Sequence, residues 1–454
     1  MWLAAAACLA VQVLLPGFIG IANNGDFGKV YAWLCLAPRG AETNFTYFQP
    51  DYIWRAQNFW NSPYHSSETA LAWLATRIAG ATHEGAPFDI RWLGATHAAL
   101  CLAAFGILQA GLRGLLRDRS PMAQAAPAIV PLLAFTDVYY AANLNSFYMD
   151  TAALLGLFLM AAAAVWMAGV GSGPRAAPFC VFALAALLFV TSKVQHAVWM
   201  WLPAALLVAW GIQWKSLRWR ALAWGSAGLL LLAGGAMLSS VDPSYRGQAM
   251  FNILFVRLGP AGADLKSLGV RPEELRYIGM NAYLPGAPAA DRGWTEAFGR
   301  RTGFGRLCAW YLRHPGSTSG LLGDTLNVGA AEMRPSNLGN FRVEDGHPAG
   351  ARSERFALWS SLRSGMLRRW PWHMVAWYLV FLAGCLASRS PLKWVAMVIA
   401  VLGAGEFTAA ALGDALDAAR HLFLFQAATD LTVCFAAGWL LGKWRAQKTM
   451  RHTP

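Results

Sequence analysis

Residues 2–28 read WLAAAACLAVQVLLPGFIGIANNGDFG, an apolar run that ends in a short polar segment. The run from Trp2 to Ala22 is long enough to cross a bilayer, whose apolar core takes about 20 residues of helix. Asp26, the first acidic residue of the chain, follows it closely. We therefore expect Asp26 to lie where a first membrane helix leaves the bilayer, as either a solvated helix-end residue or part of a site.

The composition is typical of a polytopic membrane protein, because 56% of the 454 residues are hydrophobic, 13% are charged and 22 are Trp. The formal net charge of +13 does not indicate a nucleic-acid-binding protein, since the basic residues form short clusters between apolar runs. The seven cysteines include no C-x-x-C pair, and a Cys35–Cys308 bridge is the only pairing worth testing.

Apolar runs of spanning length recur and predict an all-α polytopic membrane protein of about ten transmembrane helices. We expect a transmembrane module over 1–240 with a first outer loop over 23–91, an outer periplasmic domain over 241–371, and C-terminal helices with a short basic tail over 372–454. The predicted spans are residues 2–22, 92–112, 122–143, 151–169, 178–194, 197–213, 221–240, 372–389, 394–413 and 421–441.

Basic clusters follow every second span, and the positive-inside rule places these loops in the cytoplasm. Both termini are then cytoplasmic, and the abundance of Ala with an excess of Arg over Lys points to a bacterial inner membrane. The clusters are Arg113, Arg117 and Arg119; Arg175; Lys215, Arg218 and Arg220; Arg389 and Lys393; and Lys443, Arg445, Lys448 and Arg451.

The two long outer segments contain short helix-length pieces. In the first, aromatic residues mixed with a few charges predict helices that lie at the membrane interface, although an ordinary ectodomain helix pair remains an alternative. In the second, frequent Pro and Gly predict a small globular cap with short helices. The predicted pieces are Phe27–Ala37, Asp51–Trp60 and Ser66–Ala79 with Ser67 as N-cap, and then Pro272–Tyr277 and Gly305–Leu312.

Three short turns bring further polar residues to the same outer face as Asp26. Asp150 ends the turn between the third and fourth spans, and Lys193 and His196 lie between the fifth and sixth. Lys193 is either an interfacial anchor or a clamp on a phosphate. The turn between the last two spans carries Asp414, Asp417, Arg420 and His421. The first three of these either neutralise one another or belong, with His421, to a site.

Glu406 and Asp430 lie inside the last two predicted spans, where a charge costs at least about 2.5 to 3.5 kcal/mol and usually faces a partner or a polar cavity. His97 and Asp137 also lie within apolar runs, and we interpret them as helix-to-helix hydrogen-bonding residues.

Separated carboxylates and cations beside a membrane surface suit one chemical task. When an acceptor hydroxyl attacks a sugar linked to a lipid phosphate, one carboxylate takes the proton and cations or a metal stabilise the departing phosphate. A divalent ion such as Mg²⁺ or Mn²⁺, bound by one or two carboxylates, would contact the phosphate oxygens directly.

Three motifs carry a family resemblance: Asn-Asn-Gly-Asp-Phe-Gly at 23–28, Asn-Ser-Phe-Tyr at 145–148, and Gly-Asp-x-x-Asp-x-x-Arg-His-Leu at 413–422. The chain resembles the GT-C superfamily of membrane glycosyltransferases, and within it bacterial glycan-biosynthesis hexose transferases. The resemblance implies that Asp26 is the general base and that Asp150 is the second acidic site residue, with a role in binding a metal. Lys193 and His196 are placed for the lipid phosphate by their location alone.

We therefore predict an inverting glycosyltransferase that moves a hexose from a polyprenyl-phosphate carrier to a cell-envelope glycan at the periplasmic face. Its expected partners are a lipid-linked donor, a glycan or lipid acceptor and membrane lipids, without nucleic acid. The alternatives are a transporter or flippase of lipid-linked glycans that relays protons through Glu406 and Asp430, a glycan ligase or polymerase, and a structural subunit.

Overall fold

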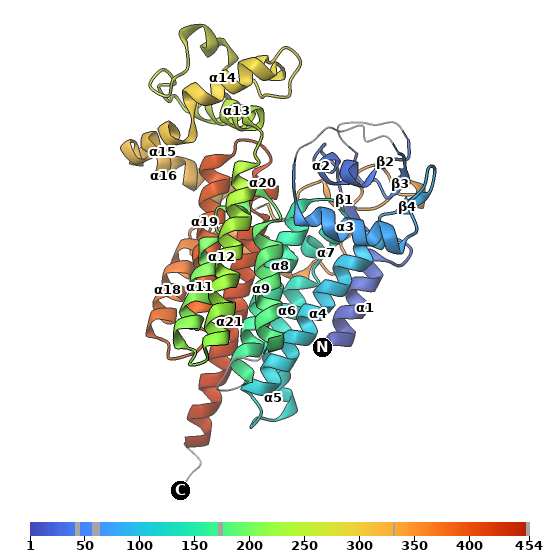
Figure 1. Cartoon of the computed structure of the whole chain (residues 1–454), viewed down its shortest axis with the longest axis vertical. Coiled ribbons are helices and arrows are strands. Elements are labelled where there is room, and N and C mark those ends of the chain that lie inside the picture. The colour runs from blue at the N-terminus through green and yellow to red at the C-terminus, as the bar shows by residue number, and fades with distance from the viewer. Residues whose placement is uncertain (41–45, 57–63, 171–175, 330–331, 451–454) are drawn as a thin grey trace.

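The computed structural model describes residues 1–40, 46–56, 64–170, 176–329 and 332–450, with side chains described to residue 441. A bundle of long helices forms the body of the molecule, and a smaller group of helices covers one end of it (Figure 1). Both termini lie toward the other end. We call the covered end the outer end, because the sequence predicts that it faces away from the cytoplasm.

The first half of the chain supplies helices on one side of the bundle. They are α1 (Trp2–Val13), α2 (Gly28–Tyr31), α3 (Ser67–Ile78), α4 (Arg91–Leu115), α5 (Pro121–Ala125), α6 (Ile129–Phe135), α7 (Val138–Leu144), α8 (Met149–Gly169), α9 (Ala176–Val190), α10 (Val194–Ala197), α11 (Trp201–Gln213) and α12 (Leu217–Ser239). Short 3₁₀ turns are η1 (Ala32–Leu34) and η2 (Ala126–Ala128).

The second half supplies the smaller outer group and then returns to the bundle. Its helices are α13 (Pro243–Asn252), α14 (Arg292–Thr302), α15 (Phe304–Arg313), α16 (Pro315–Asp324), α17 (Leu358–Arg369), α18 (His373–Ala387), α19 (Lys393–Gly413), α20 (Ala418–His421) and α21 (Phe423–Met450). The π-helical turns are η3 (Ile253–Leu258) and η6 (Thr325–Gly329), and the 3₁₀ turns are η4 (Pro272–Tyr277), η5 (Pro288–Ala290) and η7 (Val343–Asp345).

Helix α8 runs through the centre of the bundle, between α4 and α9, and is buried on nearly all sides. Small residues allow its neighbours to approach closely. A Cβ added at Gly111 of α4 would lie within 2.7 Å of the Trp166 backbone of α8. Close backbone contact through small residues is how helices pack where lipid supplies no hydrophobic drive, so this pair anchors the bundle.

Six helices of the described chain are long and apolar enough to cross a membrane, or up to eight if each of two bent pairs is one span. The bent pairs are α5 and α6 with α7, at 64°, and α17 with α18, at 107°. The shorter apolar helices α1 and α9 coincide with two further predicted spans. The structure therefore supports six to eight of the ten predicted membrane spans.

The first helix is shorter than predicted, because it ends at Val13 rather than Ala22. Pro16 lacks a backbone N–H and Gly17 adopts a positive φ of 79°, so the chain cannot continue as a helix there. It turns instead into strand β1 (Gly20–Ile21), which pairs with β5 (Leu338–Asn340). The polar residues of the 23–28 motif therefore follow a strand and not a helix.

A second small sheet also departs from the all-α prediction. Strand β3 (Asp51–Trp54) lies between β2 (Leu36–Pro38) and β4 (Pro87–Asp89), in antiparallel pairings. The predicted helix over 51–60 was wrong over 51–54, since aromatic and β-branched side chains at 52–54 suit a strand. Residues 57–60 of that prediction lie outside the described residues.

Two of the predicted outer-segment helices are also corrected. The piece over 27–37 is broken into α2, η1 and β2, with Cys35 in a left-handed conformation between the last two. Helix α3 matches the prediction for 66–79, but Ser66 rather than Ser67 caps it, because the Ser66 hydroxyl accepts the Glu68 backbone N–H.

The helices at the outer end share a hydrophobic core of their own. It is built from residues between Met250 and Leu321, including Phe251 and Phe298, and the Trp294 ring stacks on Phe298. The 3₁₀ turn η4 and helix α15 match the two short helices predicted there. Leu326, Met333 and Leu338 instead pack against the main core, so the chain has already rejoined the body by these residues.

All seven cysteines are free, so Cys35 and Cys308 do not form the bridge considered from the sequence. Of the basic residues used to orient the chain, Arg175 and Arg451 lie outside the described residues. The predicted topology and domain boundaries stay predictions.

Candidate functional site

The loop that carries Asp26 is held by the side chain of Asn23. The Asn23 Oδ1 accepts the backbone N–H groups of Gly25 at 2.9 Å and Phe27 at 3.3 Å. Gly25 has a φ of 96°, which an L side chain rarely adopts, so the turn needs glycine there. This turn fixes the backbone on both sides of Asp26 at the outer end of the bundle.

Two cations hold the Asp26 carboxylate. The Lys29 Nζ donates to Asp26 Oδ1 at 2.7 Å, and Arg420 Nη1 donates to Asp26 Oδ2. The Asp26 side chain keeps 22% of its exposure, so water reaches the pair. Lys29 follows Asp26 by three residues in the chain. Arg420 instead belongs to α20, in the turn between the last two spans. Residues from the two ends of the chain therefore meet here.

Arg420 is the centre of this cluster. Its Nη1 lies 3.3 Å from Asn24 Oδ1, and its Nε lies 3.0 Å from Asp417 Oδ2 as an ion pair. The Tyr148 ring lies below the guanidinium, 4.8 Å from its centroid, and the Tyr148 hydroxyl is 2.8 Å from Asn24 Oδ1. These contacts depend on the planar shape of the guanidinium group as well as on its charge.

The charges of the cluster reinforce one another. Burial by itself would raise the pKa of Asp26, but Arg420 and Lys29 outweigh it and hold that pKa far below its ordinary value. Burial would lower the pKa of Lys29, but Asp26 outweighs it and the pKa is raised. In this state Asp26 is a carboxylate of low basicity, and losing a cation would make it more basic.

Asp417 has an unusual backbone, since its φ of 55° is left-handed for a residue that is not glycine. Its carboxylate also accepts the Asn24 Nδ2 at 3.2 Å. Left-handed backbone in a non-glycine residue costs free energy and persists where surrounding contacts enforce it. The ion pair to Arg420 and the bond to Asn24 are such contacts.

His421 and Asp414 form a second ion pair in the same turn, with the His421 Nε2 at 2.7 Å from Asp414 Oδ2. Burial would raise the pKa of Asp414, but His421 and the backbone N–H groups of Ala415 and Leu416 lower it below its usual value. Of the three residues considered for mutual neutralisation, Asp417 pairs with Arg420, but Arg420 also reaches Asp26.

The other predicted site residues form a buried cluster inside the bundle. The Lys193 Nζ lies 3.1 Å from Asp150 Oδ2, and the His196 Nε2 lies 3.3 Å from Asp150 Oδ1. The His196 Nδ1 lies 2.8 Å from Glu406 Oε1. The His196 ring thus bridges two carboxylates, and the Lys193 ammonium contacts one of them.

The two clusters are linked. Burial lowers the pKa of Arg420, but several anionic neighbours, Asp26 foremost and Asp150 among them, raise it well above its ordinary value. Tyr64 also joins the clusters, because its ring lies 5.5 Å from the Lys29 Nζ and its hydroxyl accepts the Val194 N–H next to Lys193. The charge of Arg420 thus acts on both predicted acidic site residues.

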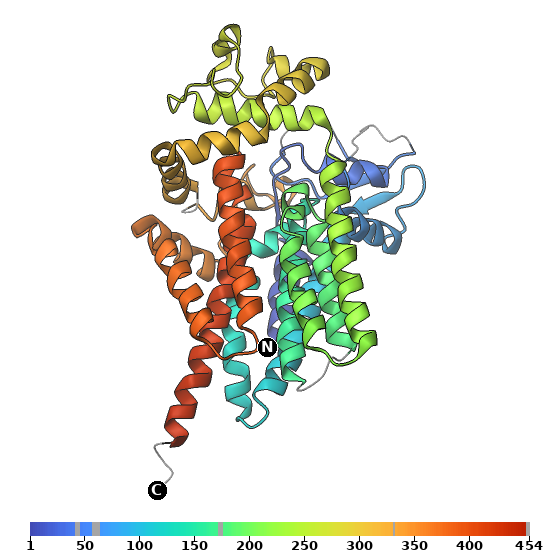
Figure 2. The ribbon, with the colours of Figure 1, turned by 60° about the vertical axis from the view of Figure 1, so that its left-hand side comes forward.

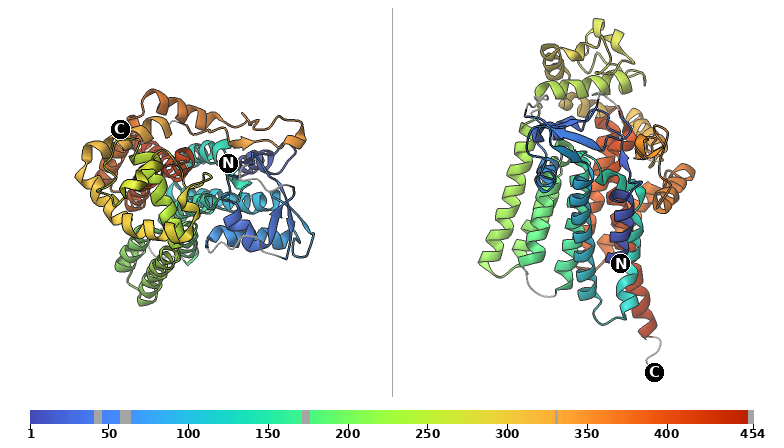
Figure 3. Two further views of the ribbon diagram at one scale, coloured as in Figure 1. Left: turned by 90° about the horizontal axis from the view of Figure 1, so that it is seen from above. Right: turned by 90° about the vertical axis from the view of Figure 1, so that its right-hand side faces the viewer.

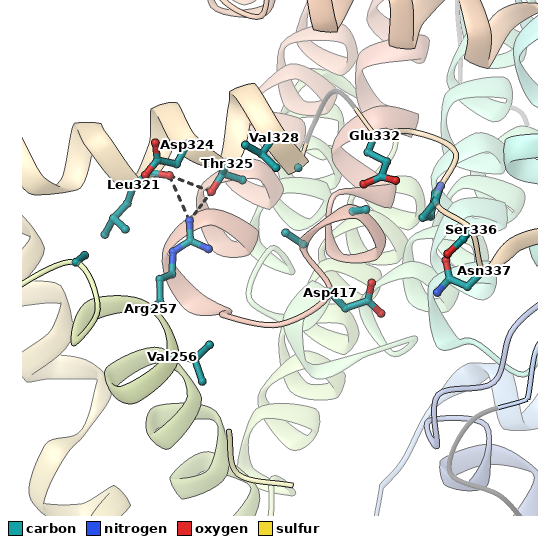
Figure 4. Close-up of a pocket in the computed structure, with 15 residues that line it drawn as sticks. Val256, Arg257, Leu321, Asp324, Thr325, Val328, Glu332, Ser336, Asn337 and Asp417 are labelled. Atoms are coloured by element: carbon teal, nitrogen blue, oxygen red, sulfur yellow. Dashed lines mark hydrogen bonds between the residues drawn. The ribbon is translucent and has the colours of Figure 1, made fainter. Parts of the chain in front are cut away.

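A cavity of about 650 Å³ opens beside Asp417 (Figure 4). Glu332, Ser336 and Asn337 lie on one side of it, and Asp417 lies toward its base. On the other side Arg257 of η3 donates to the Thr325 hydroxyl and to the Leu321 carbonyl oxygen, the latter at 3.2 Å. The lining therefore offers carboxylates, an amide and hydroxyl groups in one concave surface.

The surroundings of Asp150 do not fit a divalent metal ion. Both of its oxygens already contact the Lys193 ammonium, and Oδ1 also lies 3.3 Å from the His196 Nε2. Among the described residues no group of three or more His, Cys, Asp or Glu side chains could hold a metal. A metal ion requires several oxygen or nitrogen donors that are not paired with positive charge.

Three contact residues were missed from the sequence: Lys29, Tyr64 and Tyr148. Lys29 follows Asp26 by one helical turn, and that spacing could have indicated it. Tyr148 lies within a quoted motif but gave no sign that it packs on a guanidinium. Tyr64 gave no signal, because its contacts come from segments distant in sequence.

Glu406 and Asp430 do not share one path. Glu406 belongs to the His196 cluster, whereas Asp430 pairs with Arg363 of α17 and accepts the Tyr140 hydroxyl at 2.6 Å. His97 lies 2.8 Å from the Leu144 carbonyl oxygen, and Asp137 caps α7 and accepts the Ser360 N–H at 3.0 Å. The interpretation of these last two as helix-to-helix hydrogen-bonding residues is confirmed.

Solved structures of an archaeal oligosaccharyltransferase from Archaeoglobus fulgidus show similarity to this chain. One is tethered to an acceptor peptide containing the NVT sequon (12% identity, TM-score 0.40, 99% of this chain and 50% of that chain covered). Another is the AglB complex with an inhibitory peptide and a dolichol-phosphate (12% identity, TM-score 0.40, 100% and 51% covered). The chain thus spans about half the length of these structures.

No curated protein matches the chain. A family model does match, that of the YfdI N-terminal transmembrane domain, and the match extends over residues 2–453. Such a match covers nearly every helix described above, including all residues of both charged clusters. The chain is therefore a multi-pass membrane protein that belongs to the family of the YfdI N-terminal transmembrane domain.

Proposed function

We propose that this protein is an inverting glycosyltransferase that moves a hexose from a polyprenyl-phosphate carrier to a cell-envelope glycan at the periplasmic face of a bacterial inner membrane. The observation that carries the proposal is the contact of one partly exposed carboxylate, Asp26, with two cations, Lys29 and Arg420. The resemblance of the motifs at 23–28, 145–148 and 413–422 to the GT-C superfamily supports it.

The reaction needs a proton acceptor and a site for a leaving phosphate. The acceptor oxygen forms a bond to the sugar C1 while its proton passes to the Asp26 carboxylate. The bond between C1 and the phosphate oxygen breaks, and its electron pair leaves with the phosphate. Attack on the face opposite the leaving group inverts C1. Lys29 and Arg420 are the cations that would stabilise the charge developing on the phosphate.

The ion pairs explain how the base would become active only with donor bound. In the absence of substrate, Lys29 and Arg420 hold the pKa of Asp26 low. A donor phosphate brings negative charge that competes for the same two cations, and this competition raises the basicity of Asp26. The base would then be strongest when the phosphate is in place, which disfavours proton transfer without a donor.

The cavity beside Asp417 is our candidate for the acceptor glycan. Its carboxylates, amide and hydroxyls are groups that hydrogen-bond sugar hydroxyls, and Asp417 connects it to Arg420 at 3.0 Å. An acceptor in this cavity would approach Asp26 from the side of Asn24, whose amide contacts Asp417 at 3.2 Å. We route no step through a metal, since the surroundings of Asp150 do not fit one.

The test is sugar transfer in membranes that contain the full chain and a radiolabelled polyprenyl-phosphate hexose. Asp26→Asn should reduce transfer to the level of membranes without the protein, while the protein stays folded. Asp118→Asn, at a side chain that is 92% exposed on the loop between α4 and α5, is the matched control and should leave transfer unchanged. Full transfer by Asp26→Asn would remove the proposed base.

One observation favours a second function, a proton-coupled transporter or flippase. The Asp150–His196–Glu406 chain runs between three helices that qualify as membrane spans or their ends. Chains of carboxylates and His inside membranes often relay protons. Uptake of a lipid-linked glycan into vesicles that depends on a pH gradient, and that Glu406→Gln abolishes while sugar transfer persists, would favour that function over ours.

A further inference from the structure

A second cavity, of about 230 Å³, lies apart from the Asp26 cluster. It is formed between the segment 334–352 and helix α17. Its lining is unusually basic for its size, with three arginines, two serines and a glycine. The lining residues are Arg334, Arg352, Ser361, Ser364, Gly365 and Arg368.

Little negative charge balances these arginines. Arg334 Nη1 pairs with Glu354 Oε2 at 2.6 Å, and Glu354 is otherwise exposed to solvent. Arg352 Nη1 donates to the carbonyl oxygens of Arg334 and Pro335, at 2.7 and 3.1 Å. Arg368 has no ion pair within the described part of the chain. Three guanidinium groups therefore meet one carboxylate, which leaves the cavity positively charged.

The residues that line this cavity carry several hydrogen-bond donors. They include three arginine guanidinium groups, of Arg334, Arg352 and Arg368, and the hydroxyl groups of two serines. The position therefore suits an anion with several acceptor oxygens, and phosphate is the group whose geometry arginine matches best.

Helix α17 presents an apolar stripe beside the cavity. Leu358, Leu362 and Met366 recur at a spacing of four residues and are 70%, 56% and 40% exposed. Trp370 and Trp372 follow at the bend to α18 and are also exposed. Figure 2 shows α17 crossing near the upper end of α18, and the two helices are bent by 107°. An apolar stripe, exposed Trp and this angle are typical of a helix that lies in the membrane interface.

We propose that this cavity binds the phosphate of an anionic membrane phospholipid, whose acyl chains lie along the apolar stripe of α17. The cavity supplies the charge, and the stripe places it at the depth of lipid headgroups. The inference does not rest on the proposed glycosyl transfer, because the lining is distinct from that of the larger cavity. Only the backbone joins them: Arg334 lines one cavity and Pro335 the other.

The experiment uses the purified full chain in neutral detergent and native mass spectrometry with phosphatidylglycerol or phosphatidylcholine at equal concentration. The wild-type protein should retain phosphatidylglycerol preferentially. Arg368→Ala should weaken this retention about fivefold, and Arg352→Ala with Arg368→Ala roughly thirtyfold. Arg369→Ala is the matched control, since Arg369 neighbours Arg368 but lies over the Trp370 ring rather than in the cavity.

Arg368 makes no ion pair in the described structure, so Arg368→Ala should keep the wild-type unfolding temperature and serves as the variant that cannot fail by misfolding. Equal retention by the wild-type and Arg368→Ala proteins would overturn the proposal. So would an equal loss in Arg369→Ala, because it would mean a diffuse basic surface. Displacement of the lipid by the same concentration of inorganic phosphate would overturn the assignment to a lipid.

Discussion

Two arginine–aspartate pairs in this protein differ in what surrounds them. Arg420 and Asp26 meet at the outer end of the bundle, where the carboxylate keeps 22% of its exposure and touches a second cation. Arg363 and Asp430 meet between α17 and α21, where Asp430 is fully buried and also accepts the Tyr140 hydroxyl. Seen from the outer end, these helices stand on one side of the bundle (Figure 3).

The contrast separates a structural ion pair from one that can react. The Arg363 guanidinium is buried and bonded to buried groups, because its Nη1 pairs with Asp430 and its Nη2 donates to Gln426 Oε1 at 2.5 Å. Arg420 and Lys29 share one carboxylate that an incoming anion could replace. A buried pair resists exchange since each charge would be left uncompensated, whereas a partly exposed group can trade partners at lower cost.

The largest expected effect is on the buried pair. Arg363→Ala should destabilise the protein by about 3–5 kcal/mol, because it leaves the Asp430 carboxylate buried without a cation. Transfer should fall only in proportion to the loss of folded protein. Denaturant unfolding in detergent measures the first quantity. An unfolding free energy equal to that of the wild type would show that Asp430 takes another partner.

The next effect should be on activity rather than stability. Arg420→Lys keeps the charge but loses the planar contacts to Asp26, Asn24 and Tyr148. We expect transfer to fall about 10²- to 10³-fold, the usual loss for one stabilising donor. Unfolding free energy should change by less than about 1 kcal/mol. If stability fell as much as in Arg363→Ala, the two pairs would not differ as we describe.

The third prediction concerns the buried cluster of Asp150, Lys193, His196 and Glu406. His196→Gln leaves Asp150 with Lys193 and Glu406 with Gln195, and should cost about 1–3 kcal/mol of stability. Adding Glu406→Gln removes the carboxylate that lost its imidazole partner, so the double variant should be more stable than the sum of the single effects. Strict additivity of the two substitutions would mean that His196 and Glu406 do not interact.

The smallest effect is in the pH dependence of stability. The pKa of Asp26 is depressed, so its stabilisation is complete above the unfolded value of about 3.9 and is lost as pH falls through the folded value. The pKa of Lys29 is raised, so its share is complete below about 10.4 and is lost at higher pH. The difference in unfolding temperature between wild type and Asp26→Asn should be constant from about pH 5 to 7, and a slope within this range would contradict the depressed pKa of Asp26.

Much of the site could be anticipated because its residues stand at the ends of apolar runs. Asp26, Asp150, Lys193 and Arg420 all follow or precede such runs, and helix ends on one side of a membrane must share a surface. The strands were missed because β1 and β3 are too short for a periodic pattern and depend on partners elsewhere in the chain. Pro16 and Gly17 indicated that α1 ends early, but the apolar run around them favoured a longer helix in the prediction.

The sequence by itself determined that the chain crosses a membrane many times and which charged side chains stand at the ends of its apolar runs, because hydropathy and charge clusters are local properties of the chain. Only the tertiary structure decided which charges meet. Asp26 and Arg420 are 394 residues apart, and nothing local distinguishes Arg420 from Arg363 as a partner. That choice follows from how α20 and α21 pack against the first loop and α17, since an ion pair depends on distances of a few ångströms that packing alone sets.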